Sequence, residues 1–210
     1  MINETDAEKA FEDEMGEASY YDPAKNPMAP IAEGVYPAHI IGCSIDRNRV
    51  IKSDTLADIY NPIYRIAEAA ADRTYYLTDA DGAETEVCGD KFVGREVKGS
   101  GIFRFKNPAG DSRFRGLKDN TGGNFRYMEF TEFIGVEPEK QMVDGKVKFR
   151  LRTLTEDDLI GKPLHISVFK STWISKKAAS LGQEFSAIKA VAQGPWTEGL
   201  ESVPEEEIPF

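Results

Sequence analysis

The sequence is poor in the residues that most often build metal centres. Its 210 residues include only two cysteines, Cys43 and Cys88, and two histidines, His39 and His165. The cysteines form no C-x-x-C pair, and with two histidines they make a poor metal-ligand set. We therefore expect no metal and two buried thiols, with a disulfide as the less favoured alternative in a reducing cytosol.

A catalytic constellation is also missing. Each histidine falls within a predicted strand, and the carboxylates cluster at the two ends of the chain, where no pocket would shift their pKa. The glycines at 94, 99, 101, 122 and 123 lack the lysine and hydroxyl residues of a phosphate-binding loop, so we interpret them as turns. The sequence predicts no catalytic residue, no cofactor and no enzymatic activity.

Long apolar runs are absent. No segment is apolar enough to cross a bilayer, and the start Met-Ile-Asn-Glu-Thr-Asp is acidic where a secretory signal would be basic and then apolar. We expect a protein of the bacterial cytoplasm with no membrane partner.

Charge is abundant but unevenly distributed. The net charge is −10, yet residues 1–33 hold nine acids and two bases, and residues 197–210 hold five acids and no base. Residues 34–196 keep 22 acids and 24 bases, and within them residues 91–126 carry nine bases against three acids. The pattern predicts an acidic N-terminal arm (1–33), a mildly basic domain (34–196) and an acidic C-terminal tail (197–210).

The basic domain has the texture of a β protein. Strands are predicted from Gly34 to the Asp46–Asn48 turn, in a hairpin from Tyr75 to Val87 that turns at Asp81–Gly82, and in the alternating run Gly99–Lys106. Ile59–Ala71 is ambiguous between strand and helix, and strand is preferred. Further strands are expected at Lys146–Arg152, Leu164–Val168 and Phe185–Val191.

One longer helix is predicted at Phe125–Ile134, because its apolar residues recur at helical spacing and Gly135 follows as a C-terminal cap. A short helix is expected from Thr155 to Gly161. One helix after the third strand is the element order of the OB-fold, a five-stranded Greek-key barrel that binds single strands, although a β-sandwich would show similar patterning.

A single-strand groove needs cations for phosphates and flat rings for bases. The chain interleaves both, so we predict DNA contacts from two strands and two loops. The candidates are Arg104, Lys106, Arg113, Phe114, Arg115, Lys148, Arg150, Arg152, Trp173, Lys176 and Lys177.

Each candidate has a structural alternative. Phe103, Phe105 and Phe149 are expected in the core, because alternation with charge is typical of a half-buried strand. Phe114 and Trp173 serve equally well as covers of small apolar clusters. The structural alternative for the cationic rows is that they are ordinary solvated strand faces. Their concentration in one part of a chain with an acidic tail favours a binding surface instead.

The chain ends in Glu205, Glu206, Glu207, Ile208, Pro209 and Phe210. This ending resembles the C-terminal tip of bacterial single-stranded DNA-binding proteins, with Glu in place of the usual Asp and without a long Gly/Gln-rich linker. The resemblance implies a docking peptide whose Phe ring and terminal carboxylate enter a partner pocket. The alternative is an acidic tail that only aids solubility.

A second resemblance covers residues 33–193. The segments Glu33-Gly-Val-Tyr-Pro-Ala, Phe92-Val-Gly-Arg and Asp158-Leu-Ile-Gly-Lys are similar to those of phage-type single-stranded DNA-binding proteins with OB-folds. It implies a fold and a DNA-binding role in bacteriophage replication or recombination, without fixing particular contacts.

The sequence thus predicts a protein that coats single-stranded DNA without base-specific readout and recruits replication or recombination enzymes through its tip. Its tethered acidic tail should compete with DNA for the groove. A homo-oligomer is left open. The rivals are an acidic decoy that captures the partners of the host single-strand protein without binding DNA, and a small virion or scaffold protein. The excess of bases in residues 91–126 favours DNA binding over the decoy, which would not need it.

Overall fold

The computed structural model describes residues 30–196, apart from 53, 80, 110, 144 and 175–183. It divides the chain into two units, Met1–Pro30 and Ile31–Phe210, and only the second is described below. The predicted acidic arm therefore lies almost wholly outside the described residues, as does the whole predicted tail.

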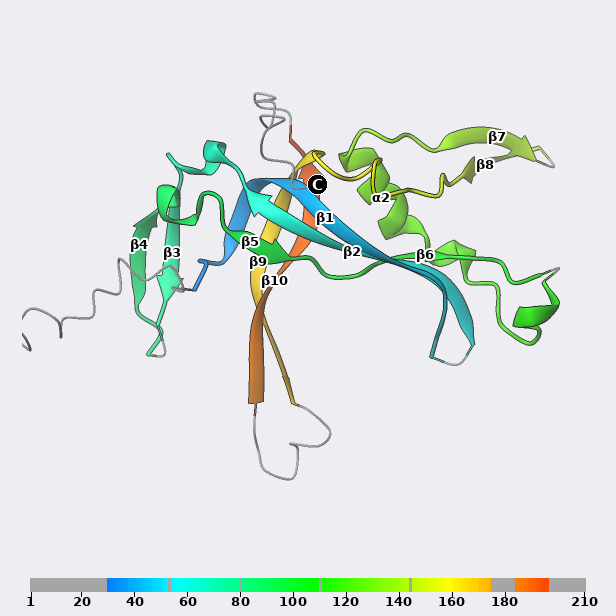
Figure 1. Cartoon of the computed structure of the whole chain (residues 1–210), viewed down its shortest axis with the longest axis horizontal. Coiled ribbons are helices and arrows are strands. Elements are labelled where there is room, and N and C mark those ends of the chain that lie inside the picture. Colours follow the sequence, from blue (N-terminus) through cyan, green and yellow to red (C-terminus); the bar gives the residue numbers. More distant parts are fainter. Residues whose placement is uncertain are drawn as a thin grey trace, which may run out of the picture. The chain divides into compact units, whose positions relative to one another are not determined.

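The described residues are mainly β, as predicted (Figure 1). The strands are β1 Gly34–Ile51, β2 Thr55–Ile66, β3 Thr74–Thr78, β4 Glu84–Cys88, β5 Glu96–Lys98, β6 Ile102–Phe105, β7 Glu139–Val143, β8 Lys146–Arg150, β9 Pro163–Ile174 and β10 Glu184–Pro195. The helical elements within the described residues are one α-helix, α2 Phe125–Phe133, and four 3₁₀ turns, η2 Glu68–Ala70, η3 Gly89–Phe92, η4 Ser112–Phe114 and η5 Thr121–Gly123.

The main sheet has six strands in the order β10-β9-β1-β2-β5, with β6 as a second neighbour of β2. Its ladders are all antiparallel. Alternation sets which side chains face inward: Tyr36, Ala38 and Ile40 of β1 are fully buried, as are Leu164 and Ile166 of β9. The same period along β2 buries Asp58 on the face that carries Tyr60 and Tyr64.

A proline explains why the neighbour of β2 is split in two. Pro62 has no N–H to donate, and at this point the partner of β2 changes from β5 to β6. Its carbonyl accepts instead from the Gly99 N–H at 2.8 Å. A Cβ on Gly99 would lie 2.7 Å from the Tyr64 ring, so only glycine lets the chain cross here.

The two ends of the sheet meet at one point. Gly99 forms an isolated parallel bridge with Ala190 of β10, and the Ser100 N–H donates to the Ala190 carbonyl at 2.7 Å. The ladders of the described strands do not otherwise close into a barrel. The prediction of a mainly β fold with one α-helix is confirmed for the described residues. The helix follows the fourth strand of the main sheet, β6, where it was expected after the third, and the sheet is open where a barrel was expected.

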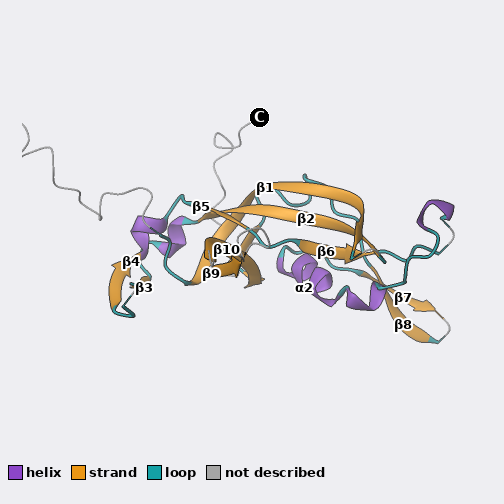
Figure 2. Cartoon of the chain, turned by 90° about the horizontal axis from the view of Figure 1, so that it is seen from below, coloured by secondary structure: helices purple, strands orange, loops and turns teal. Residues whose placement is uncertain are grey.

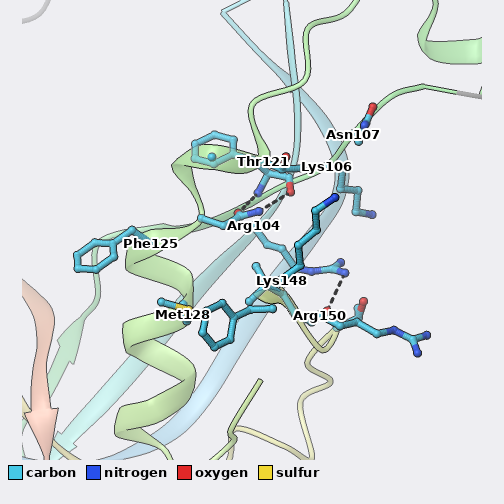
Figure 3. A pocket seen from close by; sticks show the side chains of 14 residues that line it. Arg104, Lys106, Asn107, Thr121, Phe125, Met128, Lys148 and Arg150 are labelled. Atoms are coloured by element: carbon cyan, nitrogen blue, oxygen red, sulfur yellow. Dashed lines mark hydrogen bonds between the residues drawn. The ribbon is translucent and has the colours of Figure 1, made fainter. Parts of the chain in front are cut away.

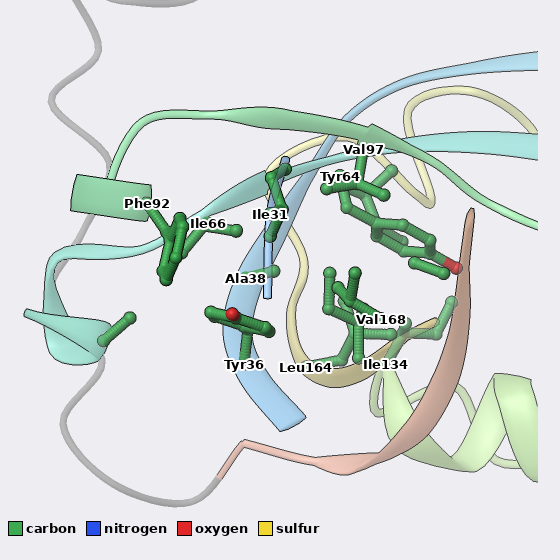
Figure 4. Close-up of a cluster of buried hydrophobic side chains, with 14 of the residues drawn as sticks. Ile31, Tyr36, Ala38, Tyr64, Ile66, Phe92, Val97, Ile134, Leu164 and Val168 are labelled. Carbon is green, nitrogen blue, oxygen red and sulfur yellow. The ribbon is translucent and has the colours of Figure 1, made fainter. Parts of the chain in front are cut away.

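The core is formed by buried side chains of the main sheet together with those of the β3–β4 hairpin, η3 and α2 (Figure 4). Tyr36 stacks on Tyr75 of β3 with ring centroids 4.0 Å apart, and Phe92 of η3 meets the Tyr36 ring edge-on at 5.9 Å. These aromatic contacts fasten the β3–β4 hairpin to β1. The hairpin and its turn at Gly82, with φ of 83°, agree with the prediction.

The ambiguous segment 59–71 proves to be both elements in succession, since β2 runs to Ile66 and the 3₁₀ turn η2 follows. Helix α2 also agrees with the prediction. Gly135, with φ of 73°, ends it, and the Val136 N–H reaches back to the Thr131 carbonyl at 2.7 Å. Figure 2 shows α2 beside β6.

Several local expectations were wrong. Residues 156–161 form a bend and turns and no helix. The Asp158 carboxylate accepts from the Thr155 N–H at 2.8 Å, as a helix cap would, but only the Ile160 N–H then donates four residues back, to the Glu156 carbonyl at 2.9 Å. Strand β7 was not predicted at all. Cys43 is buried as expected, whereas Cys88 is exposed at the end of the edge strand β4, and both are free thiols.

The histidines belong to the structure of the sheet. His39 lies edge-on to Trp196 with ring centroids 5.1 Å apart, and burial lowers its pKa. His165 Nδ1 lies 3.0 Å from the Pro195 carbonyl oxygen. Both therefore tie β1 and β9 to the end of β10.

Candidate nucleic-acid interface

A basic pocket of about 980 Å³ lies between β6, the start of α2 and the β7–β8 hairpin (Figure 3). It brings together residues from segments far apart in the sequence. The lining residues are Arg104, Phe105, Lys106, Asn107, Thr121, Gly122, Asn124, Phe125, Met128, Lys148, Phe149, Arg150, Leu151 and Thr153.

The cations of β6 are held by a buried carboxylate. Asp58 lies opposite Arg104 in the β2–β6 ladder and its side chain is fully buried. Its oxygens are 3.2 Å from an Arg104 nitrogen, 2.8 Å from Lys106 Nζ and 3.4 Å from an Arg47 nitrogen. We call these four residues the Asp58 cluster. One carboxylate meets three cations, so two positive charges remain uncompensated.

A bulge in β1 brings Asn48 into contact with the Asp58 cluster. The register of β1 and β2 shifts between Asp46 and Arg49, and Asn48 takes a φ of 54°. This bulge lets the Asn48 N–H donate to Asp58 at 3.0 Å, while the Asn48 side-chain oxygen accepts from Lys106 Nζ at 2.8 Å. Arg47 also donates to the Tyr60 hydroxyl at 2.7 Å.

The electrostatics of Asp58 follow from these contacts. Burial acts to raise its pKa, but the hydrogen bonds from Lys106 and the Asn48 N–H, with the charges of Lys106 and Arg47, outweigh burial and hold the pKa below its usual value. The group is therefore an anion at neutral pH, and the cations around it are ordered by its charge.

The opposite wall is the β7–β8 hairpin, whose strand β8 is exposed along its whole length. It contributes Lys148, Phe149 and Arg150 to the basic pocket. Arg150 pairs with Glu139 across the hairpin at 3.6 Å, a contact between two exposed groups that holds it weakly. The Phe149 ring is 45% exposed, so a side chain predicted for the core faces solvent.

Helix α2 supplies the third side. Asn124 at its start is buried and exchanges two hydrogen bonds with the Phe105 backbone, at 2.7 and 2.9 Å. These bonds fix the beginning of the helix against β6. The next residue, Phe125, is 61% exposed and lies across the pocket from Arg150 in Figure 3.

Phe105 and Phe125 also line an adjoining apolar pocket of about 530 Å³. Phe103 and Phe105 stack there with ring centroids 6.1 Å apart. The polarity of β6 is thus the reverse of the prediction: Phe103 is 37% exposed, whereas the Arg104 side chain is only 18% exposed because it reaches Asp58.

The structure brings together four of the predicted DNA-binding residues, Arg104, Lys106, Lys148 and Arg150. The other candidates that lie among the described residues do not line this pocket. Arg113 forms an ion pair with Asp111 at 2.7 Å and lies 5.4 Å from the Phe114 ring in η4, beside exposed Arg115.

Arg152 and Trp173 also lie elsewhere. Arg152 pairs with Asp158 at 2.6 Å, in a hollow that Glu137, Glu139 and Asp157 also line. Trp173 is 45% exposed within β9, not in a loop as predicted. Lys176, Lys177 and residues 205–210 lie outside the described residues.

Sequence reasoning missed the aromatic members of the basic pocket. The helical spacing predicts Phe125 on the apolar face of the helix, and the strand alternation predicts Phe149 in the core. The sequence contained a sign that Phe149 would be exposed. Lys146, Lys148 and Arg150 alternate with apolar residues there, and no neighbouring apolar strand is available to bury the apolar face. No such signal marks Phe125, whose exposure depends on how Asn124 fixes the start of the helix.

Within residues 30–196, as far as they are described, no group of three or more metal-ligating side chains comes together, and no helix is long and apolar enough to cross a membrane. The arrangement offers cations held by Asp58 and exposed cations of β8 beside exposed rings, and such a surface can bind a polyanion that carries flat groups. Comparisons with protein-family models, with curated proteins and with solved structures return no match, so the geometry of the basic pocket carries the functional argument.

Proposed function

We propose that this protein binds single-stranded DNA through the basic pocket, without reading its sequence, in bacteriophage replication or recombination. The observation that carries the proposal is the convergence of Arg104 and Lys106 with Lys148 and Arg150 around exposed rings. Cations that line one pocket can neutralise backbone phosphates, whichever bases are attached.

Exposed rings favour a single strand over a duplex. Phe125 and Phe149 offer their faces to solvent at the pocket, and bases are free to stack on them only where they are unpaired. In a duplex the bases are already stacked on one another, and only the phosphates would reach the cations.

The topology also supports this function. We propose that the sheet is an OB-fold barrel in which the third strand region and the last strand are joined by a single bridge and not by a full ladder. In support, three antiparallel strand regions precede α2, two follow it, and the third region meets the last strand in parallel at Gly99 and Ala190. The basic pocket is lined by the third of these regions, the start of α2 and the inserted β7–β8 hairpin, and the second region supplies Asp58 to its cations Arg104 and Lys106.

The C-terminal tip remains a second element of the proposal. Glu205–Phe210 would dock replication or recombination enzymes, because its acidic run, its final ring and its carboxylate suit a basic pocket with an apolar floor. The acidic tail before it would compete with DNA for the same cations.

A salt-series titration with a fluorescent oligonucleotide tests the proposal. We expect tighter binding of single strands than of duplex, with affinity that falls steeply as salt rises. A chain ending at Trp196 serves as the control for competition by the tail, and it should bind more tightly. If neither chain binds at low salt, DNA binding is wrong and the decoy hypothesis takes its place.

A further inference from the structure

We infer that Asp58 is a positioning residue for DNA binding: its buried negative charge orders Arg104 and Lys106 for contact with backbone phosphates. The inference rests on the proposed function and extends it to a residue that DNA never touches. It assigns an acidic residue, which would ordinarily repel DNA, a role in binding it.

The geometry of the Asp58 cluster carries the argument. The carboxylate is fully buried and lies within 3.4 Å of three cations. The Arg104 and Lys106 side chains are 18% and 26% exposed, so each is anchored at one side and open at the other. Arg104 also donates to the Leu151 carbonyl at 3.3 Å.

The charge balance shows why anchoring does not neutralise the site. A single carboxylate shared by three cations leaves the Asp58 cluster with a net charge of +2, and two of its three cations, Arg104 and Lys106, line the basic pocket. Long side chains lose rotamer entropy when they bind a ligand, and cations that are already ordered lose less. Lys148 on the opposite wall has no ion pair among the described residues, so it does not share this advantage.

A purely electrostatic account makes the opposite prediction. Asp58→Asn raises the net charge by one unit, which should strengthen binding to a polyanion. If Asp58 orders the cations, the substitution should instead weaken binding by about tenfold, because two long side chains must then be ordered on binding.

Asp54→Asn is the matched control. Asp54 is 39% exposed and pairs with Lys118 at 2.9 Å, and neither residue lines the basic pocket. This change alters the net charge by the same unit without touching the cluster. It should leave single-strand affinity unchanged or raise it slightly.

Asn48→Gly tests the same idea without a charge change. Glycine accepts the φ of 54° at this position, and the backbone N–H to Asp58 is kept, but the acceptor for Lys106 Nζ is lost. We expect affinity to fall about threefold, because one side chain loses one of its anchors.

The measurement is the dissociation constant for a fluorescent single strand at several salt concentrations. Circular dichroism gives the folded fraction of each variant, and the constant is calculated for the folded molecules alone. No binding by the unaltered protein would overturn the proposed function itself. Normal binding by that protein, with Asp58→Asn equal to or tighter than Asp54→Asn, would overturn only the role of Asp58. If Asp58→Asn does not fold, Asn48→Gly decides, and unchanged affinity in that variant contradicts the inference.

Discussion

Two tyrosines of the same core, Tyr64 and Tyr127, differ in whether their buried hydroxyl groups have a hydrogen-bond partner. The Tyr64 hydroxyl is buried and has no hydrogen-bond partner among the described residues. The Tyr127 hydroxyl donates to the Arg152 carbonyl at 2.7 Å and lies 3.4 Å from the Tyr60 hydroxyl. An unsatisfied buried hydroxyl destabilises a fold, whereas a satisfied one contributes to it.

We predict that Tyr64→Phe leaves the free energy of unfolding unchanged or raises it by up to about 1 kcal/mol, while Tyr127→Phe lowers it by about 1 to 2 kcal/mol. Denaturant titrations of both variants measure the difference. Equal destabilisation by the two changes would mean that Tyr64 has a partner after all.

Asp58 should also make the fold sensitive to acid. Its pKa in the folded protein is lowered from the ordinary value of 3.8, so the ionised form stabilises the fold above that pH. This stabilisation is lost as the pH falls through the folded-state pKa. Stability should therefore decline below about pH 4.

Asp58→Asn should be less stable than the unaltered protein at pH 7 and should lose less stability between pH 5 and about pH 2. Chemical denaturation across this range is the measurement, with Asp54→Asn as the exposed comparison. Parallel pH curves for the unaltered protein and Asp58→Asn would show that the cluster does not couple protonation to folding.

At the pocket, Phe125→Ala and Phe149→Ala should each weaken single-strand binding by about 1 to 3 kcal/mol if their rings stack on bases. Because both rings are exposed, thermal stability should change little. Phe114→Ala in η4, outside the basic pocket, is the control and should bind normally. A uniform loss in all three variants would locate the binding surface elsewhere.

At the scale of elements, the β7–β8 hairpin has exposed faces and makes few contacts with the sheet. Its end residues Glu139 and Arg150 are directly paired, so a two-residue glycine-serine link can replace the hairpin. We predict that this deletion keeps the melting temperature within a few degrees, as expected for loss of exposed residues.

The same deletion should reduce single-strand affinity and flatten its salt dependence by about two phosphate contacts, because Lys148 and Arg150 are gone. A salt-series titration measures this slope, and the double variant Lys148→Ala with Arg150→Ala is the matched control. An unchanged slope in both would contradict the assignment of this hairpin to the DNA interface.

The elements predicted well are those whose signal is local. Alternation at Leu164–Val168, an Asp-Gly turn at 81–82 and a glycine after an apolar helix each act within a few residues, and each agrees with the structure. The β6 segment shows the limit. Its alternation was recognised, but which face is buried depends on Asp58, which lies far away in the sequence and attracts Arg104 inward.

The site was predictable to a similar extent. Its four cations follow from charged strand rows, whereas their convergence depends on pairing between distant segments. Trp173 and Arg113 have the same local chemistry as the pocket residues and lie elsewhere, because nothing in their immediate sequence specifies which surface they join.

At the scale of the whole molecule, the two acidic ends and the basic domain should act separately. Ending the chain at Glu207 removes Ile208–Phe210, and we predict that it abolishes capture of replication or recombination enzymes while DNA affinity stays nearly unchanged. Ending the chain at Trp196 should instead raise DNA affinity, since a tethered polyanion is removed. Pull-downs with host replication proteins measure the first effect, and oligonucleotide titrations measure the second. Equal recovery of partners by the full chain and by the chain ending at Glu207 would mean that the final three residues are incidental.

The contact between Gly99 and Ala190 has a consequence for how the chain acquires its fold. The third strand region leaves the ribosome long before its parallel neighbour β10 has been synthesised, and contacts between such distant residues form slowly. Until then the edge beside Gly99 offers unpaired backbone groups to other nascent chains. The contact that brings the two ends of the sheet together is therefore also one whose late formation leaves a strand edge open to aggregation during synthesis.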